Sequence, residues 1–322
     1  LRGYADDLPL MNWLQDRIWP AETKHVSHEF VKAGTQLACA EMLLGGVTCF
    51  NDMYFFPSAV CEAATLMGMR STVGLVVMDL PTEWAKEPDE YLKKGLKIRE
   101  SHAGNDLIGF SLAPHAPYTV SDSTFKKIAR LSSDESLPIH CHIHESTTEI
   151  QDSLKQYGVR PLQRLSQLGV VTDKLIGVHA IHLDEGDFVL LKSRGSHIAH
   201  CPSSNLKVSA GIAPLARLQQ EKINVGIGTD GAASSNKLDL WTELRQAALL
   251  AKVQSGDPTA WSAAHTIEAA TLGGARALGL EKKIGSLEPG KEADFIAVDF
   301  SPLELQPVYE PISHLAYAID RH

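Results

Sequence analysis

The sequence predicts an α/β protein of the (β/α)8 TIM-type barrel class, with the first strand apparently missing from this chain and part of a small β-sandwich domain at its end. Three observations support this prediction. Short runs rich in Val, Ile and Leu alternate with amphipathic helical patterns. The runs are almost continuously apolar, which is typical of parallel strands buried on both faces. No G-x-G-x-x-G turn follows a strand, which disfavours an open doubly wound sheet, the alternative architecture.

Seven segments are predicted to be strands, and each is a short apolar run bounded by polar or turn residues. In chain order they are 46–52, 71–79, 107–115, 137–145, 175–183, 196–202 and 223–231. Strands that alternate with helices pair in parallel through right-handed crossovers. An eight-stranded barrel needs one more strand, and we expect it to fall before Leu1.

Helical patterns lie between the strands. The first ends at Gly45-Gly46 and repeats apolar residues at three- and four-residue steps: Phe30, Ala33, Leu37, Ala40 and Leu44. Ser121 is a predicted N-cap for a second helix that turns Phe125 and Ile128 inward. A helix after the last strand places four apolar residues on one side: Trp241, Leu244, Ala248 and Ala251.

The pattern changes after residue 282. The segment "IGSLEPGKEADFIAVD" is punctuated by Gly and Pro, and its "DFIAVD" part alternates as a strand does. We therefore predict that the barrel domain spans residues 1–282. Residues 283–322 would begin the return to a small β-sandwich domain, which is truncated.

Composition narrows the function. The chain has 322 residues, of which 44% are hydrophobic and 21% charged, and its net charge of −9 disfavours nucleic acid or an anionic membrane as a partner. No apolar run reaches the roughly 18 residues of a membrane span. Five scattered cysteines without a C-x-x-C pair predict buried free thiols in a reducing cytoplasm. We expect a cytoplasmic protein with a small-molecule substrate, and a homo-oligomer is compatible with the sequence.

Polar side chains close several of the predicted strands. They are His115, His142, Glu145, His179, His182, His200 and Asp230. Active sites of such barrels lie at the carboxyl ends of the strands. Core packing alone does not account for so many buried histidines and carboxylates, because such groups need partners when they leave water. The pattern predicts one convergent site.

The segment "LPIHCHIHES" carries the densest group of these residues. His140, His142 and His144 share one face of a strand. His140 lies deepest and is expected to be a hydrogen-bonded interior histidine, whereas His144 is expected to line the rim. His142 lies near the mouth, where a neutral imidazole can bind a metal. Glu145 falls just past the strand end, where a carboxylate can transfer protons.

Asp230 ends the last strand, in "GIGTDGAASSN". A carboxylate there can bind a metal or act as a base, and it can equally cap the helix that follows. Taken alone, the two interpretations have equal weight. Together with the histidines, the functional interpretation is favoured.

Four motifs resemble one known family: H-x-x-E in "HIHE", "GVHAIHL", "HCPSSNLKVSAGIAPL" and "GTDGAASSN". The chain resembles the amidohydrolase superfamily over essentially its whole length. Within that superfamily it is similar to the 5-methylthioadenosine/S-adenosylhomocysteine deaminases, in the branch that also holds chlorotriazine hydrolases. "GSLEPGKEADFIAVD" matches the point where that family returns to its small β-sandwich.

The resemblance implies a role for several residues of this chain. His142 and Asp230 would be metal ligands, and Asp230 would also assist catalysis. Glu145 would be the acid/base carboxylate that meets the purine ring, and His179 the catalytic histidine beside the attacking water. Substrate contacts would come from His115 and, on the ribose hydroxyls, Glu22.

The chain departs from the family pattern at two places. The family's H-x-H, which supplies two further metal ligands, should precede "LRGYADD" and is expected upstream of Leu1. A family arginine in the segment after "GMR" has an apolar residue in its place. The implied cofactor is one divalent metal ion per subunit, zinc or else Fe²⁺ or another divalent ion.

The implied reaction is hydrolytic deamination of 5'-methylthioadenosine, S-adenosylhomocysteine or adenosine to the inosine analogue and ammonia. Within the same superfamily, a guanine, pterin or triazine hydrolase is the alternative, although Glu22 favours a ribose-bearing substrate. An alternative of another class is a catalytically inactive binding protein that lacks the H-x-H ligands. Glu145, His179 and Asp230 favour an enzyme.

Overall fold

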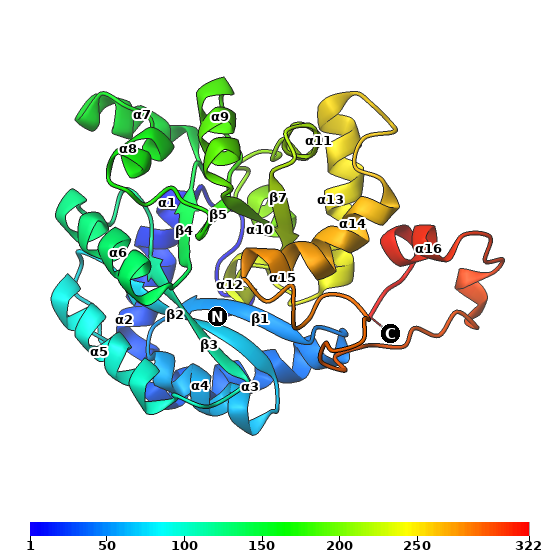
Figure 1. Ribbon diagram of the computed structural model, residues 1–322, viewed down its shortest axis with the longest axis horizontal. Helices are drawn as coiled ribbons and strands as arrows, with labels where there is room; N and C mark the ends of the chain where they lie inside the picture. Colours follow the sequence, from blue (N-terminus) through cyan, green and yellow to red (C-terminus); the bar gives the residue numbers. More distant parts are fainter. Residues whose placement is uncertain (322) are drawn as a thin grey trace.

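Seven parallel strands in sequence order form a curled sheet at the centre of the molecule (Figure 1). The computed structural model describes residues 1–321. The strands are β1 Cys49–Tyr54, β2 Arg70–Val77, β3 Ile108–Pro114, β4 Ile139–Ile143, β5 Leu175–His179, β6 His197–His200 and β7 Asn224–Ile227. All seven predicted strands are confirmed, each within a few residues of its expected ends.

Helices connect the strands and cover the outer face of the sheet (Figure 1), because a parallel connection must cross from one end of the sheet to the other. Up to β4 the helical segments are α1 Leu10–Asn12, the π-helical turn Trp13–Ile18, α2 Trp19–His25, α3 His28–Leu44, α4 Pro57–Leu66, α5 Pro88–Ser101 and α6 Asp122–Glu135. Up to β7 they are α7 Thr147–Tyr157, α8 Pro161–Gln167, α9 Glu185–Arg194, α10 Pro202–Lys207 and α11 Leu215–Gln220. After β7 they are α12 Ala232–Ser235, α13 Leu240–Ser255, α14 Ala263–Glu268, a π-helical turn Ala269–Gly273, α15 Gly274–Ala277, the 3₁₀ turn Leu303–Leu305 and α16 Pro311–Tyr317.

The hydrophobic core fills the space between the sheet and these helices. Every residue of β2 is buried. Phe125 and Ile128 of α6 are fully buried against the core, and Ser121 caps that helix by accepting a hydrogen bond from the Thr124 N–H, both as predicted. On α13, Leu244, Ala248 and Ala251 are buried as expected, whereas Trp241 is only partly covered. Burying each large apolar side chain contributes about 1.5–3 kcal/mol.

Helix α3 forms where it was predicted and ends at Gly45, but a different side of it packs. Phe30, Leu37 and Leu44 are exposed, and the buried apolar side chains are Val31, Cys39 and Met42. The helix is apolar on more than one side. The apolar periodicity therefore predicted the position of the helix but not which of its sides packs against the rest of the protein.

The curled sheet is open on one side. Strand β1 pairs with β2 and strand β7 with β6, and within residues 1–321 no strand bridges β1 and β7. The architecture is therefore a TIM-like half-barrel of seven parallel strands. Closure by an eighth strand stays a prediction.

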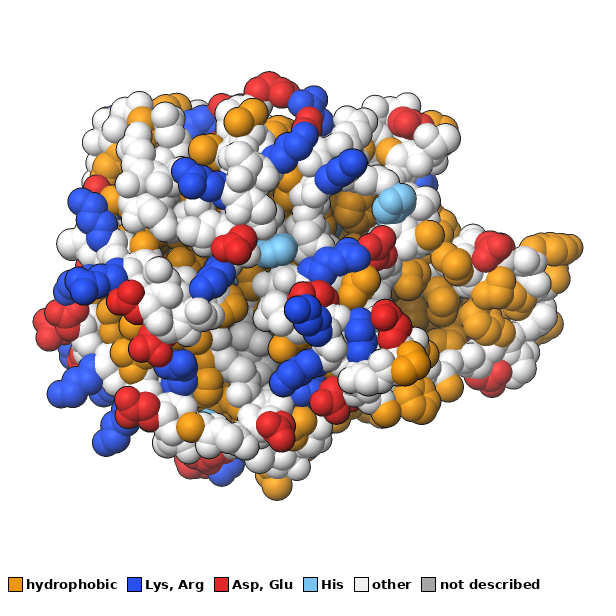
Figure 2. Space-filling view, viewed as in Figure 1, with side chains coloured by type: hydrophobic (Ala, Val, Ile, Leu, Met, Phe, Trp, Pro, Cys, Tyr) orange, Lys and Arg blue, Asp and Glu red, His pale blue; other side chains and the backbone are white. Residues whose placement is uncertain are grey.

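The segment after residue 282 differs from its prediction. "DFIAVD" (294–299) was expected to be a strand, but its backbone is irregular. A strand needs a neighbouring strand to satisfy its N–H and C=O groups, and no described residue forms such a ladder with it. Large apolar side chains gather on the arm at the right of Figure 2. The exposed large apolar residues after residue 282 include Phe295, Leu303 and Tyr309. The β-sandwich domain stays a prediction, and its last residue, 322, lies outside the described residues.

Two further properties concern membrane-spanning helices and the cysteines. No helix in residues 1–321 has the length and apolar character needed to cross a membrane. All five cysteines are free thiols, as predicted, and four are buried; Cys49 is partly exposed.

Candidate active site

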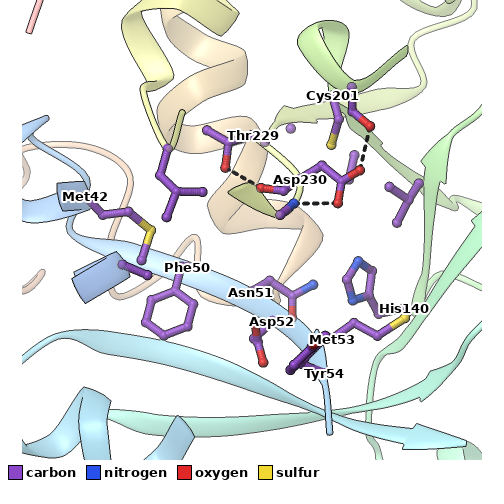
Figure 3. Close-up of a pocket in the computed structure, with 18 of the residues that line it drawn as sticks. Met42, Phe50, Asn51, Asp52, Met53, Tyr54, His140, Cys201, Thr229 and Asp230 are labelled. Atoms are coloured by element: carbon purple, nitrogen blue, oxygen red, sulfur yellow. Dashed lines mark hydrogen bonds between the residues drawn. The ribbon is translucent and has the colours of Figure 1, made fainter. Parts of the chain in front are cut away.

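One cavity of about 870 Å³ collects the carboxyl ends of the strands. It runs along the open side of the sheet, with β1 on one side and β7 and the segments after it on the other. Figure 3 shows part of it, with residues of β1, His140 and Asp230 facing one another. All six predicted site residues line it: Glu22, His115, His142, Glu145, His179 and Asp230.

The backbone is strained where three strands lead into this cavity. His144, His179 and Asp230 have positive φ angles of 52°, 72° and 58°. A residue with a Cβ rarely adopts this left-handed region, at a cost of roughly 1–3 kcal/mol each. Such strain persists only where the surrounding structure enforces it, and it gathers at functional sites.

His142, in β4, is held as a neutral ligand-type imidazole. Its Nδ1 donates a hydrogen bond to the His115 carbonyl at 2.6 Å, which leaves the lone pair of Nε2 free. Burial lowers the pKa of His142, and the neighbouring charge of His179 lowers it further. The His142 and His179 rings stack with centroids 5.4 Å apart. A ring fixed through one nitrogen is the usual arrangement of a metal-binding histidine.

His179 ends β5 and lies beside the Glu145 carboxylate. Its Nδ1 donates to Asn205 Oδ1 at 2.8 Å, so Nε2 is the atom available for chemistry, and it lies 3.7 Å from Glu145 Oε1. Burial opposes a charge on this ring, yet Glu145, Asp230 and the Asn205 hydrogen bond together raise the pKa of His179. This environment favours proton acceptance at Nε2.

Asp230, in the loop after β7, is oriented by two hydrogen bonds (Figure 3). Oδ2 accepts from the Ser204 hydroxyl at 2.7 Å, and Oδ1 accepts from the Gly231 N–H at 2.6 Å. Helix α12 starts after Gly231 without a side-chain cap, so Asp230 does not have the capping role considered from the sequence. Burial raises the pKa of Asp230, but His179 and the Ser204 hydroxyl outweigh it and hold the carboxylate ionised.

His115 and Glu22 face the same cavity from other elements. The Thr119 hydroxyl donates to the Ala116 carbonyl, so His115 Nδ1 donates to Thr119 Oγ1 at 2.9 Å and its Nε2 keeps a lone pair. Burial lowers the pKa of His115 to about 3, which keeps the ring neutral. Glu22, on α2, accepts a hydrogen bond from the Tyr54 hydroxyl at 2.8 Å; burial raises its pKa and that bond lowers it.

The other strand-end histidines have different surroundings. His144 does not line the rim as expected: it is fully buried, and its Nε2 accepts a hydrogen bond from the Leu162 N–H at 3.0 Å. His182 Nε2 donates a hydrogen bond to the Ala210 carbonyl at 2.8 Å. His140 and His200 are buried, and their Nδ1 atoms have no partner within residues 1–321.

Four side chains that sequence reasoning did not single out support the site: Tyr54, Glu149, Ser204 and Asn205. Ser204 and Asn205 are consecutive residues of α10, and they hold Asp230 and His179 respectively. They belong to the "HCPSSNLK" motif. This motif was part of the resemblance to the family, but no role was assigned to its individual residues. Glu149 is the fourth residue of a Ser-x-x-Glu pattern, which is a capping-box signal.

The donor chemistry of the site fits part of a divalent metal site. His142 Nε2 and the Asp230 carboxylate are a nitrogen and an oxygen donor of the kinds that zinc accepts. Over residues 1–321 no group of three or more metal-ligating side chains comes together. Two donors are fewer than the three or four protein ligands of a typical zinc site.

The chain matches the model of the amidohydrolase family over residues 1–319. A 5-methylthioadenosine/S-adenosylhomocysteine deaminase of Teredinibacter turnerae is 48% identical over 317 residues, which cover 98% of this chain and 72% of that protein. The corresponding protein of Saccharophagus degradans is 49% identical over 98% of this chain and 70% of its own. The crystal structure of an adenosine deaminase from Xanthomonas campestris with bound zinc has a TM-score of 0.98 at 49% identity, covering 99% of this chain and 73% of that one.

This chain belongs to the amidohydrolase family. The resemblance seen in the sequence motifs is confirmed, both for the family and for its similarity to the methylthioadenosine/S-adenosylhomocysteine deaminases.

Proposed function

We propose that this protein is a metal-dependent hydrolase that deaminates adenosine-type nucleosides, with 5'-methylthioadenosine and S-adenosylhomocysteine as the candidate substrates beside adenosine. The products are the inosine analogue and ammonia. One observation carries the proposal: Glu145, His179 and Asp230 come from three different strand ends and meet in one cavity, with His179 Nε2 3.7 Å from Glu145 Oε1. The names of the similar proteins support the same activity.

We infer that the metal is zinc, which the similar Xanthomonas structure holds, and that His142 Nε2 and Asp230 are two of its ligands. When bound, such a metal lowers the pKa of a coordinated water toward neutrality. The hydrogen bonds from His142 to the His115 carbonyl and from Ser204 to Asp230 fix both ligands in advance. The two further ligands are assigned to the predicted H-x-H.

The protein's own side chains move the protons. His179 takes one water proton at Nε2, the ring atom that Asn205 leaves free. Glu145, ionised at the start, takes the other water proton and gives it to the ring nitrogen beside the reacting carbon. The water oxygen bonds to the carbon that carries the amino group, and the proton on His179 leaves with that group as ammonia. Each positioned acid or base contributes about 10²–10⁴-fold.

Glu22 and His115 are proposed to hold the substrate. The Tyr54 hydroxyl uses one lone pair of Glu22 Oε1 and so directs the carboxylate across the cavity. The remaining lone pairs can accept hydrogen bonds from both hydroxyls of a ribose. His115, neutral and with Nε2 free, can accept a hydrogen bond from the base or its amino group.

The same proposal places the protein in the cytoplasm. Its partner is a small-molecule substrate rather than nucleic acid or a membrane, and a homo-oligomer is compatible with it. The five free thiols support a reducing compartment.

A substrate panel on the intact, metal-analysed protein tests the proposal. Ammonia release is measured with 5'-methylthioadenosine, S-adenosylhomocysteine and adenosine, and with guanine, a pterin and a chlorotriazine as the alternatives. Turnover of the nucleosides with close to one divalent ion per subunit is expected. Turnover of only the sugar-free rings, or nucleoside turnover that survives removal of the metal by a chelator, contradicts the proposal.

A further inference from the structure

Glu149, on the first turn of α7, binds the backbone of the turn that carries Glu145. Its Oε1 accepts the His144 N–H at 3.0 Å, and its Oε2 accepts the Glu145 N–H at 2.9 Å. The side chain is buried and is not among the described residues that line the cavity. Both carboxylate oxygens are therefore committed to the backbone of the residues just before the helix.

This arrangement differs from an ordinary capping box. In a capping box, the Ser accepts the N–H of the Glu three residues on, and the Glu returns to the N–H of the Ser. Here Ser146 Oγ accepts the Glu149 N–H at 3.1 Å, as expected. The Glu149 carboxylate instead reaches past Ser146, to the two preceding residues. The helix start is thereby fastened to the end of β4.

The turn held in this way is strained. His144 has φ +52°, a conformation that needs external support in a residue with a side chain. The imidazole of His144 gives a second attachment, because its Nε2 accepts the Leu162 N–H and its Nδ1 bonds the His182 carbonyl. Backbone and ring are thus fixed independently, and Glu145 is the next residue along the chain.

We propose that Glu149 is a positioning residue, which holds the 144–145 turn so that the Glu145 carboxylate faces His179 and the substrate. The inference rests on the proposed function of Glu145. Glu149 itself touches neither substrate nor metal ligands, and acts through the two N–H groups. Its effect falls on turnover rather than on substrate binding, because a misdirected Glu145 mainly weakens proton delivery.

Burial disfavours a charged carboxylate at this position. A carboxylate occupies it nevertheless, which supports the inference that the two acceptor oxygens of Glu149 are needed there. Burial raises the pKa of Glu149 to about 7, and the N–H bonds from His144 and Glu145 oppose that rise. An apolar side chain would fill the position without this cost but would leave two N–H groups unpaired.

Two variants of the intact enzyme, Glu149→Ala and Glu149→Gln, test the proposal. The Ala variant removes both acceptors, and we expect kcat to fall about 10²-fold, the loss typical of a misplacement near 1 Å, while KM changes by less than about threefold. The Gln variant keeps one acceptor oxygen, so its kcat should lie between those of the wild type and the Ala variant. Zinc content should stay unchanged in both.

Asp79→Ala is the matched control. Asp79 also fastens a helix start, because it accepts the Ser121 N–H and the hydroxyls of Ser121 and Thr124 at the start of α6, and it is not among the described cavity residues. This variant should melt at a lower temperature with unchanged kcat. An equal fall of kcat in Asp79→Ala and Glu149→Ala would overturn the positioning role, as would full activity in folded Glu149→Ala.

Hydrogen exchange separates this inference from the proposed function, because it needs no activity. In the wild type the amides of His144 and Glu145 should exchange slowly, and in Glu149→Gln at least one of them should exchange faster while the β4 amides stay protected. Unchanged protection of both amides overturns the inference even when the enzyme deaminates nucleosides. If the wild type shows no deamination but the exchange shift occurs, only the proposed function fails. The Gln variant remains informative if the Ala variant does not fold.

Discussion

Replacing Asn205 by alanine tests how His179 is prepared for proton transfer. Asn205 is buried, and its Oδ1 accepts the only hydrogen bond that His179 Nδ1 makes within the described residues, at 2.8 Å. Without it, a buried N–H donor loses its partner, which costs about 1–3 kcal/mol. The ring can then adopt the other tautomer, with the proton on Nε2, or rotate away from Glu145. Loss of such an orienting contact typically lowers activity about 10–100-fold.

The pH dependence gives this prediction a second readout. The Asn205 hydrogen bond is one of the contacts that raise the pKa of His179, together with Glu145 and Asp230. His179 acts as the base only when unprotonated, so kcat rises with pH as the ring loses its proton. Removal of Asn205 lowers this pKa, and the acid limb of the kcat–pH profile should move to lower pH. Initial rates of ammonia release at saturating nucleoside, measured across the acid range, report both effects.

Asn224→Ala is the matched control for Asn205→Ala. Asn224 is the first residue of β7, and its Nδ2 bonds His197 Nδ1 at 3.0 Å and the Gly273 carbonyl at 2.9 Å. None of these three residues is among the described residues that line the cavity. This variant should lose stability but keep both kcat and its pH profile. The reasoning would be refuted by an Asn205→Ala enzyme whose kcat stays within about threefold of the wild type and whose acid limb does not move.

Two more predictions concern a substrate contact and a buried carboxyl group. Glu22→Ala should weaken turnover of adenosine-type nucleosides far more than of sugar-free bases, because each lost charge-assisted hydrogen bond to the ribose is worth about 1.5–3 kcal/mol; equal losses in kcat/KM on both would make Glu22 structural. Burial raises the pKa of Glu243 from 4.5 to about 7. Between these two pH values the folded state keeps a proton that the unfolded state has lost. The stability contributed by the neutral carboxyl group is therefore fully present below pH 4.5 and is lost as the pH rises through about 7. Denaturant unfolding at several pH values should therefore show Glu243→Gln gaining up to about 3 kcal/mol on the wild type between pH 4.5 and 8; a constant difference would contradict the raised pKa.

The strands and the site residues at their ends were predictable because both follow from local pattern. Short Val/Ile-rich runs between helical patterns are typical of buried parallel strands, and the carboxyl ends of such strands meet at the mouth of the barrel. His142, His179 and Asp230 were located in this way, from three runs that are far apart in sequence.

The remaining features depend on which distant segments meet. The packed face of α3 could not be chosen, since Leu37 and Cys39 are both apolar and only the neighbouring elements decide which is covered. "DFIAVD" has the pattern of a strand, but no described segment pairs with it. Asn205 reaches His179 across 26 positions, a contact that no spacing rule predicts. His144 was misassigned to the rim because strand alternation ends before the left-handed turn that buries it.

Turnover of 5'-methylthioadenosine by Glu145→Gln, with the metal content of the same sample, tests the central claim most directly. Glutamine keeps the shape of Glu145, which lies beside His179, but cannot carry a proton to the ring nitrogen. The proposed mechanism predicts that kcat falls at least about 10²-fold while the metal content stays that of the wild type. Near-normal turnover in this variant would contradict the mechanism and remove Glu145 from it.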